Sequence, residues 1–272
     1  MKHSARNDID QSLADQKHLD GFVVSDLHLF AQRSVGGVFQ QEMQRAAAGA
    51  DFFVLAGDIF DFEWSTVGSV AQSVLPAMAW VRELIDAADN CHIHYVLGNH
   101  DSLAPFVHQL QQLARTHENF FWHEACVRIG NSLFLHGDLP IYGRGRNLLH
   151  RQIPQTIAQR GRILNHAYRA FVATRLHRRV ERFICREKCA DSILAALQLA
   201  PPEIRDGITD IYFGHTHTPF SDFDYRGYRF HNTGSAIRHL ELNMLPVRAE
   251  GNYPHGPAGL GGGNRSDDAG AS

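Results

Sequence analysis

Side chains that can bind metal ions gather in five turns of this sequence, and each turn directly follows a short apolar run. Polar groups are costly to bury at the end of such a run unless something satisfies them. We therefore expect these turns to form a functional site rather than part of a core. They are Ser25-Asp26-Leu27-His28, Gly57-Asp58, Gly98-Asn99-His100-Asp101, His136-Gly137-Asp138 and Gly214-His215-Thr216-His217.

The side chains in these turns predict a site for two transition-metal ions. Mixed carboxylate, amide and imidazole ligands suit manganese, iron, zinc or cobalt better than a calcium cage or a thiolate zinc site. The turns offer more ligands than one ion uses, and a bridging carboxylate would allow a second ion. Two ions roughly 3.5–4 Å apart can clamp a phosphoryl group for in-line attack.

The apolar runs before the turns predict strands, and the segments between them predict helices. Runs without alternation, such as Phe52–Ala56 and Ile93–Leu97, suit strands covered on both faces. Strands alternating with helices indicate α/β layers. We expect helices at Gln40–Ala48, Val70–Ala88 and Ser102–Ala114, with a start or kink near Pro76, and later strands at Tyr228–His231 and Ala236–Leu240 around Asn232-Thr233-Gly234-Ser235.

We expect one main domain at residues 20–250, preceded by a polar leader at 1–19 and followed by a disordered Gly-, Asn- and Ser-rich tail at 251–272. From about 140 to 207 the apolar residues recur at spacings of three and four, which predicts a helical insertion. The sequence shows neither the hydrophobic region of a secretory signal peptide nor an apolar run long enough to cross a membrane, so we expect a cytoplasmic protein. The four cysteines form no CxxC pair and are expected to be reduced, buried thiols.

The predicted insertion is strongly basic. Between Arg144 and Lys188 the sequence has twelve Lys or Arg and two acids, so with a net charge of −3 the rest of the chain sums to about −13. Many positive charges close together repel one another unless an anion neutralises them. The alternative is that they form a charged helical face exposed to solvent. We expect contact with an anionic substrate, or with a membrane surface, through residues that can share one helical face: Arg175, Arg178, Arg179 and Arg182. Nucleic acid is disfavoured because most aromatic residues of the insertion fall on its apolar stripe.

The motif order D-x-H, GD, GNHD, HGD and GH-x-H resembles the calcineurin-like metallophosphoesterases, over residues 22 to about 240. The resemblance implies an α/β (α+β) fold, a four-layer α/β-β/α sandwich with metal ions at the strand ends. It implies that Asp58 bridges the two ions and that His100 is catalytic, stabilising phosphoryl oxygens or protonating the leaving oxygen. We expect Asp101 to orient His100. The other implied ligands are Asp26, His28 and His217 for the first ion, and Asn99, His136 and His215 for the second.

The segment GDIFDFEW and the helical insertion resemble the branch that contains UDP-2,3-diacylglucosamine pyrophosphatase, in which a helical lid accommodates acyl chains. The chain departs from that branch at His100, where well-known members have arginine, and in Leu139–Arg146, where their polar residues are not recognisable. Our first expectation for the substrate is a lipid-linked nucleotide sugar. A phosphatase or phosphodiesterase acting on nucleotides or phosphoproteins is the alternative, and a catalytically inactive binding module is a remote one. The resemblance implies two divalent ions, manganese first, with iron, zinc or cobalt also compatible.

Overall fold

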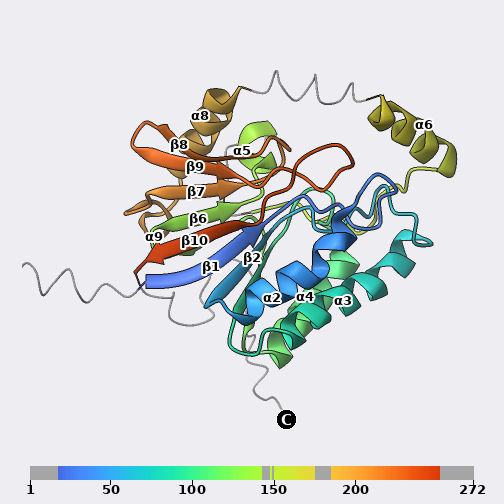
Figure 1. The fold of residues 1–272 in the computed structure, drawn as a ribbon, viewed down its shortest axis with the longest axis horizontal. Coiled ribbons are helices and arrows are strands. Elements are labelled where there is room, and N and C mark those ends of the chain that lie inside the picture. Colours follow the sequence, from blue (N-terminus) through green and yellow to red (C-terminus); the bar gives the residue numbers. More distant parts are fainter. Residues whose placement is uncertain (1–17, 143–147, 149, 175–184, 252–272) are drawn as a thin grey trace, which may run out of the picture.

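The computed structural model describes residues 18–142, 148, 150–174 and 185–251, and within them two five-stranded sheets pack face to face (Figure 1). The first sheet has the strand order β10-β1-β2-β3-β4 and the second β5-β6-β7-β9-β8. The strands of the first sheet are β1 (His18–Val24), β2 (Phe52–Ala56), β3 (His92–Val96), β4 (Phe120–His123) and β10 (Leu245–Glu250). Those of the second are β5 (Cys126–Ile129), β6 (Ser132–Leu135), β7 (Asp210–Phe213), β8 (Phe220–Tyr225) and β9 (Tyr228–Asn232).

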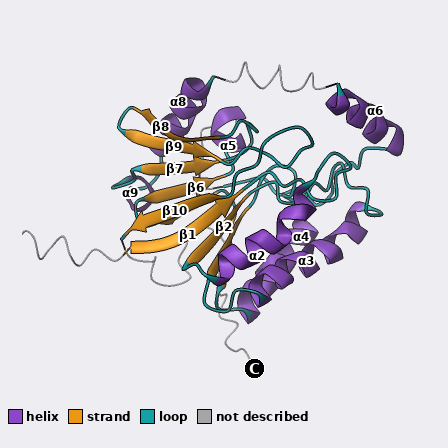
Figure 2. Ribbon diagram, in the orientation of Figure 1, coloured by secondary structure: helices purple, strands orange, loops and turns teal. Residues whose placement is uncertain are grey.

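Helices cover the outer faces of both sheets, which gives the mixed α/β sandwich that the sequence predicted (Figure 2). Against the first sheet pack α2 (Gln40–Ala48), α3 (Val70–Asp86) and α4 (Ala104–Thr116), and the buried residues of α8 (Arg186–Leu197) belong to the core of the second sheet. The remaining helical elements are η1 (Gly36–Phe39), α5 (Asp138–Tyr142), α6 (Arg162–Ala173) and α9 (Pro202–Arg205).

Parallel pairing brings the site turns to one edge of the sandwich. β1, β2, β3 and β4 are parallel neighbours, and so are β6, β7 and β9. Between the sheets lies an apolar layer in which Phe52 and Phe134 meet edge to face, with ring centroids 6.0 Å apart. Because parallel strands end at the same edge, the turns that follow five of these strands meet there.

Three details of the secondary structure differ from the sequence prediction. α3 begins at Val70, as the predicted range did, and Ser69 and Gln72 form a capping box there, so the helix does not start near Pro76, which lies inside it. β8 and β10 were not predicted, and Pro246 places β10 at the sheet edge that tolerates proline. Ala236–Leu240 is not a strand, although Ile237 forms an isolated bridge. The proposed boundaries of the insertion remain a prediction, and α8, within them, packs against the second sheet.

Two histidines, the buried His94 and the half-buried His123, lie side by side on neighbouring strands β3 and β4. The ring of His94 stacks on Phe121 and on His123, with centroids 5.0 and 5.4 Å apart, and its Nδ1 lies 3.1 Å from His123 Nε2. Burial lowers the pKa of His94 well below its ordinary value and that of His123 to about 4. Both rings are therefore neutral at pH 7.

This pair predicts a loss of stability in mild acid. The folded pKa values lie below the unfolded value of about 6.5, so the unfolded chain takes up protons first as the pH falls. The stabilisation is complete above about pH 6.5 and is lost between that pH and about 4. The free energy of unfolding would be measured in urea at pH 7.5 and at pH 5. Between these two pH values it should fall less in His123→Phe than in the parent, by on the order of 1 kcal/mol. His108→Gln, at an exposed position on α4, is the control, and an equal acid loss in parent and His123→Phe would contradict the prediction.

Candidate metal centre

The five turns meet at the edge of the sandwich, and their ligand residues have an unusual backbone. Asp26 N donates to Gly57 O at 3.0 Å and His28 N to Asp58 O at 2.9 Å, which joins the first two turns. Left-handed backbone is uncommon for residues other than glycine and concentrates at functional sites, with Asn, Asp and His tolerating it best. Five of the expected ligands have φ between 47° and 65°: Asp26, His28, Asp58, His215 and His217.

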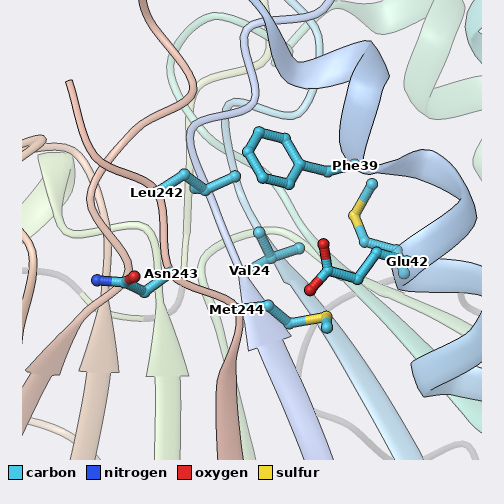
Figure 3. Close-up of a pocket in the computed structure, with 7 residues that line it drawn as sticks. Val24, Phe39, Glu42, Leu242, Asn243 and Met244 are labelled. Carbon is cyan, nitrogen blue, oxygen red and sulfur yellow. The ribbon is translucent and has the colours of Figure 1, made fainter. Parts of the chain in front are cut away.

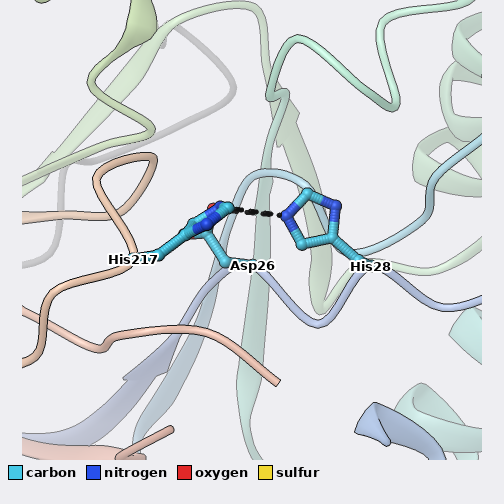
Figure 4. Close-up of side chains that lie close together, drawn as sticks. All are labelled: Asp26, His28 and His217. Carbon is cyan, nitrogen blue, oxygen red and sulfur yellow. Dashed lines mark hydrogen bonds and ion pairs between the residues drawn. The ribbon is translucent and has the colours of Figure 1, made fainter. Parts of the chain in front are cut away.

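The first cluster consists of Asp26, His28 and His217, whose side chains point toward one another (Figure 4). One ligand atom from each lies within 4.8 Å of the others. His217 Nε2 is 3.2 Å from Asp26 Oδ1 and 3.2 Å from His28 Nε2. Asp26 Oδ1 is fully buried and makes no well-formed hydrogen bond, which leaves this oxygen available to a cation.

The second cluster consists of Asp58, His136 and His215, again with ligand atoms within 4.8 Å of one another. His136 Nε2 lies 3.2 Å from Asp58 Oδ2 and 3.3 Å from Asn99 Oδ1. On the other side of the ring, His136 Nδ1 is 3.2 Å from the carbonyl oxygen of Ala56. A backbone acceptor at Nδ1 holds the ring so that Nε2 faces the site, which is the usual arrangement of a metal-binding histidine.

Asp58 lies between the two clusters. Its Oδ2 is 3.2 Å from His136 Nε2 and 3.9 Å from His28 Nε2, while its Oδ1 accepts a 2.8 Å hydrogen bond from the backbone N–H of His100. A Cβ at Gly98 would come within 2.1 Å of Asp58 Oδ1, so only glycine allows this approach. One oxygen of Asp58 is thus held by the protein, and the other is shared by both clusters.

The charges at this edge fit two divalent cations. Burial opposes the ionisation of Asp26 and Asp58, yet the surrounding histidines hold both pKa values well below the ordinary range. Burial also opposes a charge on His136, but Asp58 and Asp26 outweigh it and raise its pKa to about 10. Buried carboxylates that draw protons onto a neighbouring ring would also draw cations. Burial lowers the pKa of His215 to about 4, so this ring is in the neutral form that a metal ligand requires.

Asp61 is a functional candidate that the sequence analysis missed. Its fully buried carboxylate accepts a 2.6 Å hydrogen bond from Arg33 and lies 3.1 Å from His100 Nδ1 and 3.4 Å from His28 Nδ1. Asp61, His28 and His100 also come close enough to form a third candidate cluster. The guanidinium of Arg33 already supplies the positive charge there, so we interpret Asp61 as the group that orients the two histidines. Its position in the aromatic segment GDIFDFEW was the available signal.

The expectation that Asp101 orients His100 is wrong. The carboxylate of Asp101 accepts hydrogen bonds from Gly98 N at 2.7 Å, from Ile59 N at 3.0 Å and from the hydroxyl of Tyr95 at 2.7 Å. The backbone turn directs this side chain into the protein below the site. Its hydrogen bonds there join the loop after β2 to the loop after β3. Asp101 is therefore a structural support for the turn, and Asp61 takes the place beside His100.

Replacing Asp61 by asparagine should lower both turnover and stability. The variant should lose roughly 10–100-fold in turnover, the scale of other residues that orient a site histidine. Arg33 would lose its buried carboxylate partner, which should cost on the order of 3 kcal/mol in urea unfolding. In a His100→Ala background the same substitution should cost less turnover than in the parent, because only His28 remains for Asp61 to orient. An undiminished loss in that background would argue against an orienting effect on His100.

Part of the predicted insertion contacts the site loops. Arg151 forms two hydrogen bonds of 2.7 and 2.6 Å with Asp138, in the turn that also carries His136. Nine residues further along, the backbone N–H and the guanidinium of Arg160 bind Glu63, at 2.8 and 2.6 Å. The 151–160 segment is thus fastened to two of the site loops. The substrate-binding candidates Arg175, Arg178, Arg179 and Arg182 lie outside the described residues.

A separate cavity of about 200 Å³ lies between α2 and the segment leading into β10 (Figure 3). Its lining combines apolar side chains with the amide of Asn243 and one carboxylate, Glu42, and includes no histidine among the described residues. It therefore lacks the ligands found at the strand ends, and we assign it no part in the metal chemistry. The lining residues are Val24, Phe39, Glu42, Met43, Leu242, Asn243 and Met244.

Comparison with known proteins decides the family. The profile of the calcineurin-like phosphoesterases matches residues 22–219. The chain belongs to this family. As a calcineurin-like phosphoesterase it is a metal-dependent hydrolase of phosphate esters, and its family implies two divalent metal ions. The matched range contains all five ligand-bearing turns.

The chain is also similar to two solved structures of low sequence identity. One is a conserved uncharacterised protein from Streptococcus pneumoniae TIGR4, described as a predicted phosphoesterase, with 13% identity, a TM-score of 0.35, and coverage of 85% of this chain and 83% of that one. The other is a dimetal phosphatase from Danio rerio, with 12% identity, a TM-score of 0.46, and coverage of 85% and 92%. A search of curated proteins found no match. In the described part of this calcineurin-like phosphoesterase, no helix is long and apolar enough to cross a membrane.

Proposed function

We propose that this calcineurin-like phosphoesterase hydrolyses a phosphoester or pyrophosphate bond of an anionic substrate at two metal ions held by the strand-end turns. The observation that carries the proposal is the position of Asp58 Oδ2, 3.2 Å from His136 and 3.9 Å from His28, where one carboxylate can serve both clusters. The first ion would be held by Asp26, His28 and His217, and the second by Asn99, His136 and His215, with Asp58 between them. Two bound divalent ions would polarise the phosphoryl group and activate a water molecule.

His100 would act on the phosphoryl group rather than on the ions. Burial disfavours its charged form, but Asp58 and Asp61 outweigh burial and raise its pKa to about 9. An imidazolium at this place can stabilise charge on the phosphoryl oxygens or donate its Nε2 proton to the leaving oxygen. Because Asp61 lies against Nδ1, the opposite ring nitrogen is the one directed away from that carboxylate and toward substrate.

The substrate that we favour is a nucleotide sugar with acyl chains, resembling UDP-2,3-diacylglucosamine. Ile163 and Leu164 of α6 are 87% and 46% exposed, so this helix presents large apolar side chains to solvent. Figure 1 shows α6 standing apart from both sheets, and the 151–160 segment directly before it is fastened to the site loops. A helix in this position is suited to act as a lid over an acyl chain. The basic residues that follow it would bind the phosphate groups of the substrate or an anionic membrane surface.

A substrate screen tests this function. Purified protein with Mn²⁺, and separately with Zn²⁺, Fe²⁺ or Co²⁺, would be assayed on acylated and unacylated UDP-sugars, nucleotides, phosphoproteins, single-stranded DNA and p-nitrophenyl phosphate. We expect the highest kcat/KM on the acylated UDP-sugar with Mn²⁺. Preference for nucleotides or phosphoproteins would favour the general phosphatase alternative. No hydrolysis of p-nitrophenyl phosphate or its bis ester with any of these ions would favour the inactive binding module.

A further inference from the structure

A buried turn that contributes no expected ligand is hydrogen-bonded to the backbone of the first cluster. This 232–236 turn, Asn232-Thr233-Gly234-Ser235-Ala236, begins at the last residue of β9. Its Ser235 hydroxyl and Ala236 N–H both donate to the carbonyl oxygen of Asp26, each at 3.0 Å. The amide of Asn232 donates to the carbonyl oxygen of Gly214 at 2.9 Å. The turn therefore braces the backbone of two ligand-bearing turns that are distant in sequence.

The side chain of Asp26 is held through a chain of hydroxyl groups that ends in this turn. Asp26 Oδ2 accepts hydrogen bonds from the hydroxyl of Ser25 at 2.5 Å and from the backbone N–H of His215 at 2.9 Å. The Ser25 hydroxyl lies 2.6 Å from that of Thr233, and Thr233 Oγ1 accepts from Ser25 N at 3.2 Å. Ser25, Asp26 and Thr233 are all at most 1% exposed.

These contacts determine which group donates in each hydrogen bond made by the hydroxyls of Ser25 and Thr233. A carboxylate can only accept, so the Ser25 hydroxyl donates to Asp26 and must itself accept from Thr233. Thr233 in turn accepts from the backbone of Ser25. Hydrogen bonds arranged head to tail in a buried site strengthen one another, and the last one is assisted by the charge of the carboxylate. Asp26 Oδ2 is thereby saturated, while Oδ1 keeps no well-formed hydrogen bond and faces His217 at 3.2 Å.

We propose that Thr233 is a positioning residue for the first metal ion, acting through Ser25 to turn one oxygen of Asp26 toward the protein and the other toward the ion. The inference rests on the proposed assignment of Asp26 as a ligand. Without the Thr233 hydroxyl, the Ser25 hydroxyl loses its donor in a buried place, and the carboxylate is held less firmly toward His28 and His217, although the His215 N–H still binds its Oδ2. Groups that orient a ligand from behind typically contribute 10–100-fold to metal affinity.

The test compares isosteric and hydroxyl-retaining variants by metal affinity. Full-length Mn²⁺-loaded protein is challenged with graded chelator, and the dissociation constant of each ion is obtained from retained Mn²⁺. Thr233→Val should weaken one of the two ions by roughly 10–100-fold and leave the other within about twofold. Thr233→Ser, which keeps the hydroxyl, should resemble the parent. Ser25→Ala is the second variant and should show the same selective loss if Thr233→Val folds poorly.

Two controls identify the ion and the mechanism. Thr209→Val removes a similar hydrogen bond, from Thr209 to Asp210 Oδ2 at 2.7 Å at the opposite end of β7, and should leave both ions unchanged. In a His136→Ala background, which spares the first cluster, Thr233→Val should still weaken the remaining ion. Parental affinity for both ions in Thr233→Val and Ser25→Ala, or equal losses in Thr233→Ser and Thr233→Val, would overturn the inference. A parent that holds fewer than two ions would instead overturn the proposed function.

Discussion

Replacing Asp58 by asparagine should abolish hydrolysis and leave fewer than two metal ions per chain. Asp58 Oδ2 is the atom that both clusters share, and an amide in its place removes the negative charge that would hold two cations together. We expect turnover to fall by roughly 10³-fold or more, since a single oxyanion-stabilising group alone contributes roughly 10²–10³. Metal content by elemental analysis and hydrolysis of p-nitrophenyl phosphate with excess Mn²⁺ check both parts.

Two variants make this result interpretable. Asp224→Asn, at an exposed position on β8, changes the same functional group away from the site and should retain two ions and full turnover. His136→Ala should also lose an ion, because its Nε2 lies against Asp58 in the second cluster. Two bound ions and parental activity in Asp58→Asn would remove the basis of the site assignment.

Replacing His100 by alanine should separate catalysis from metal binding. His100 Nδ1 lies 3.1 Å from Asp61, so this ring is held beside the two proposed ligand sets and belongs to neither. We expect both ions to remain while turnover falls by roughly 10²–10⁴, the usual scale of a positioned acid. The loss should be smaller for substrates with good leaving groups, which need little protonation.

Leaving-group dependence is the decisive measurement for His100. A series of phenyl phosphates with leaving groups of increasing pKa, assayed in parent and His100→Ala, should show a steeper dependence in the variant. A parallel dependence would restrict His100 to stabilising the phosphoryl oxygens. Loss of a metal ion in His100→Ala would instead assign it to the ligands and contradict the role proposed here.

The strand-end turns were predictable because their signal is local. A run such as Phe52–Ala56 predicts a buried strand, and the Gly57-Asp58 that follows predicts a ligand where that strand ends. Parallel order then requires these ends to meet, as the structure shows. β10 escaped prediction because Pro246 interrupts its pattern and its partner β1 is more than 200 residues away in the sequence.

The partner of His100 was not predictable from neighbouring residues. Asp101 follows it directly, but successive residues of a turn point in different directions, and Asp101 supports the loop after β2 instead. Asp61 reaches His100 from a loop 39 residues earlier, a proximity that only tertiary packing creates. The link between Thr233 and Ser25 spans 208 residues and was hidden for the same reason.

The left-handed backbone at the expected ligands also shapes how this family can change. Asparagine adopts that conformation as readily as aspartate, so Asp26 or Asp58 can become asparagine with little disturbance of the chain. The exchange removes the charge that cations require while keeping size and backbone shape. In evolutionary terms, one nucleotide change in either codon would exchange a proposed metal ligand. The proposed site therefore predicts that a single substitution would leave an intact sandwich without hydrolysis.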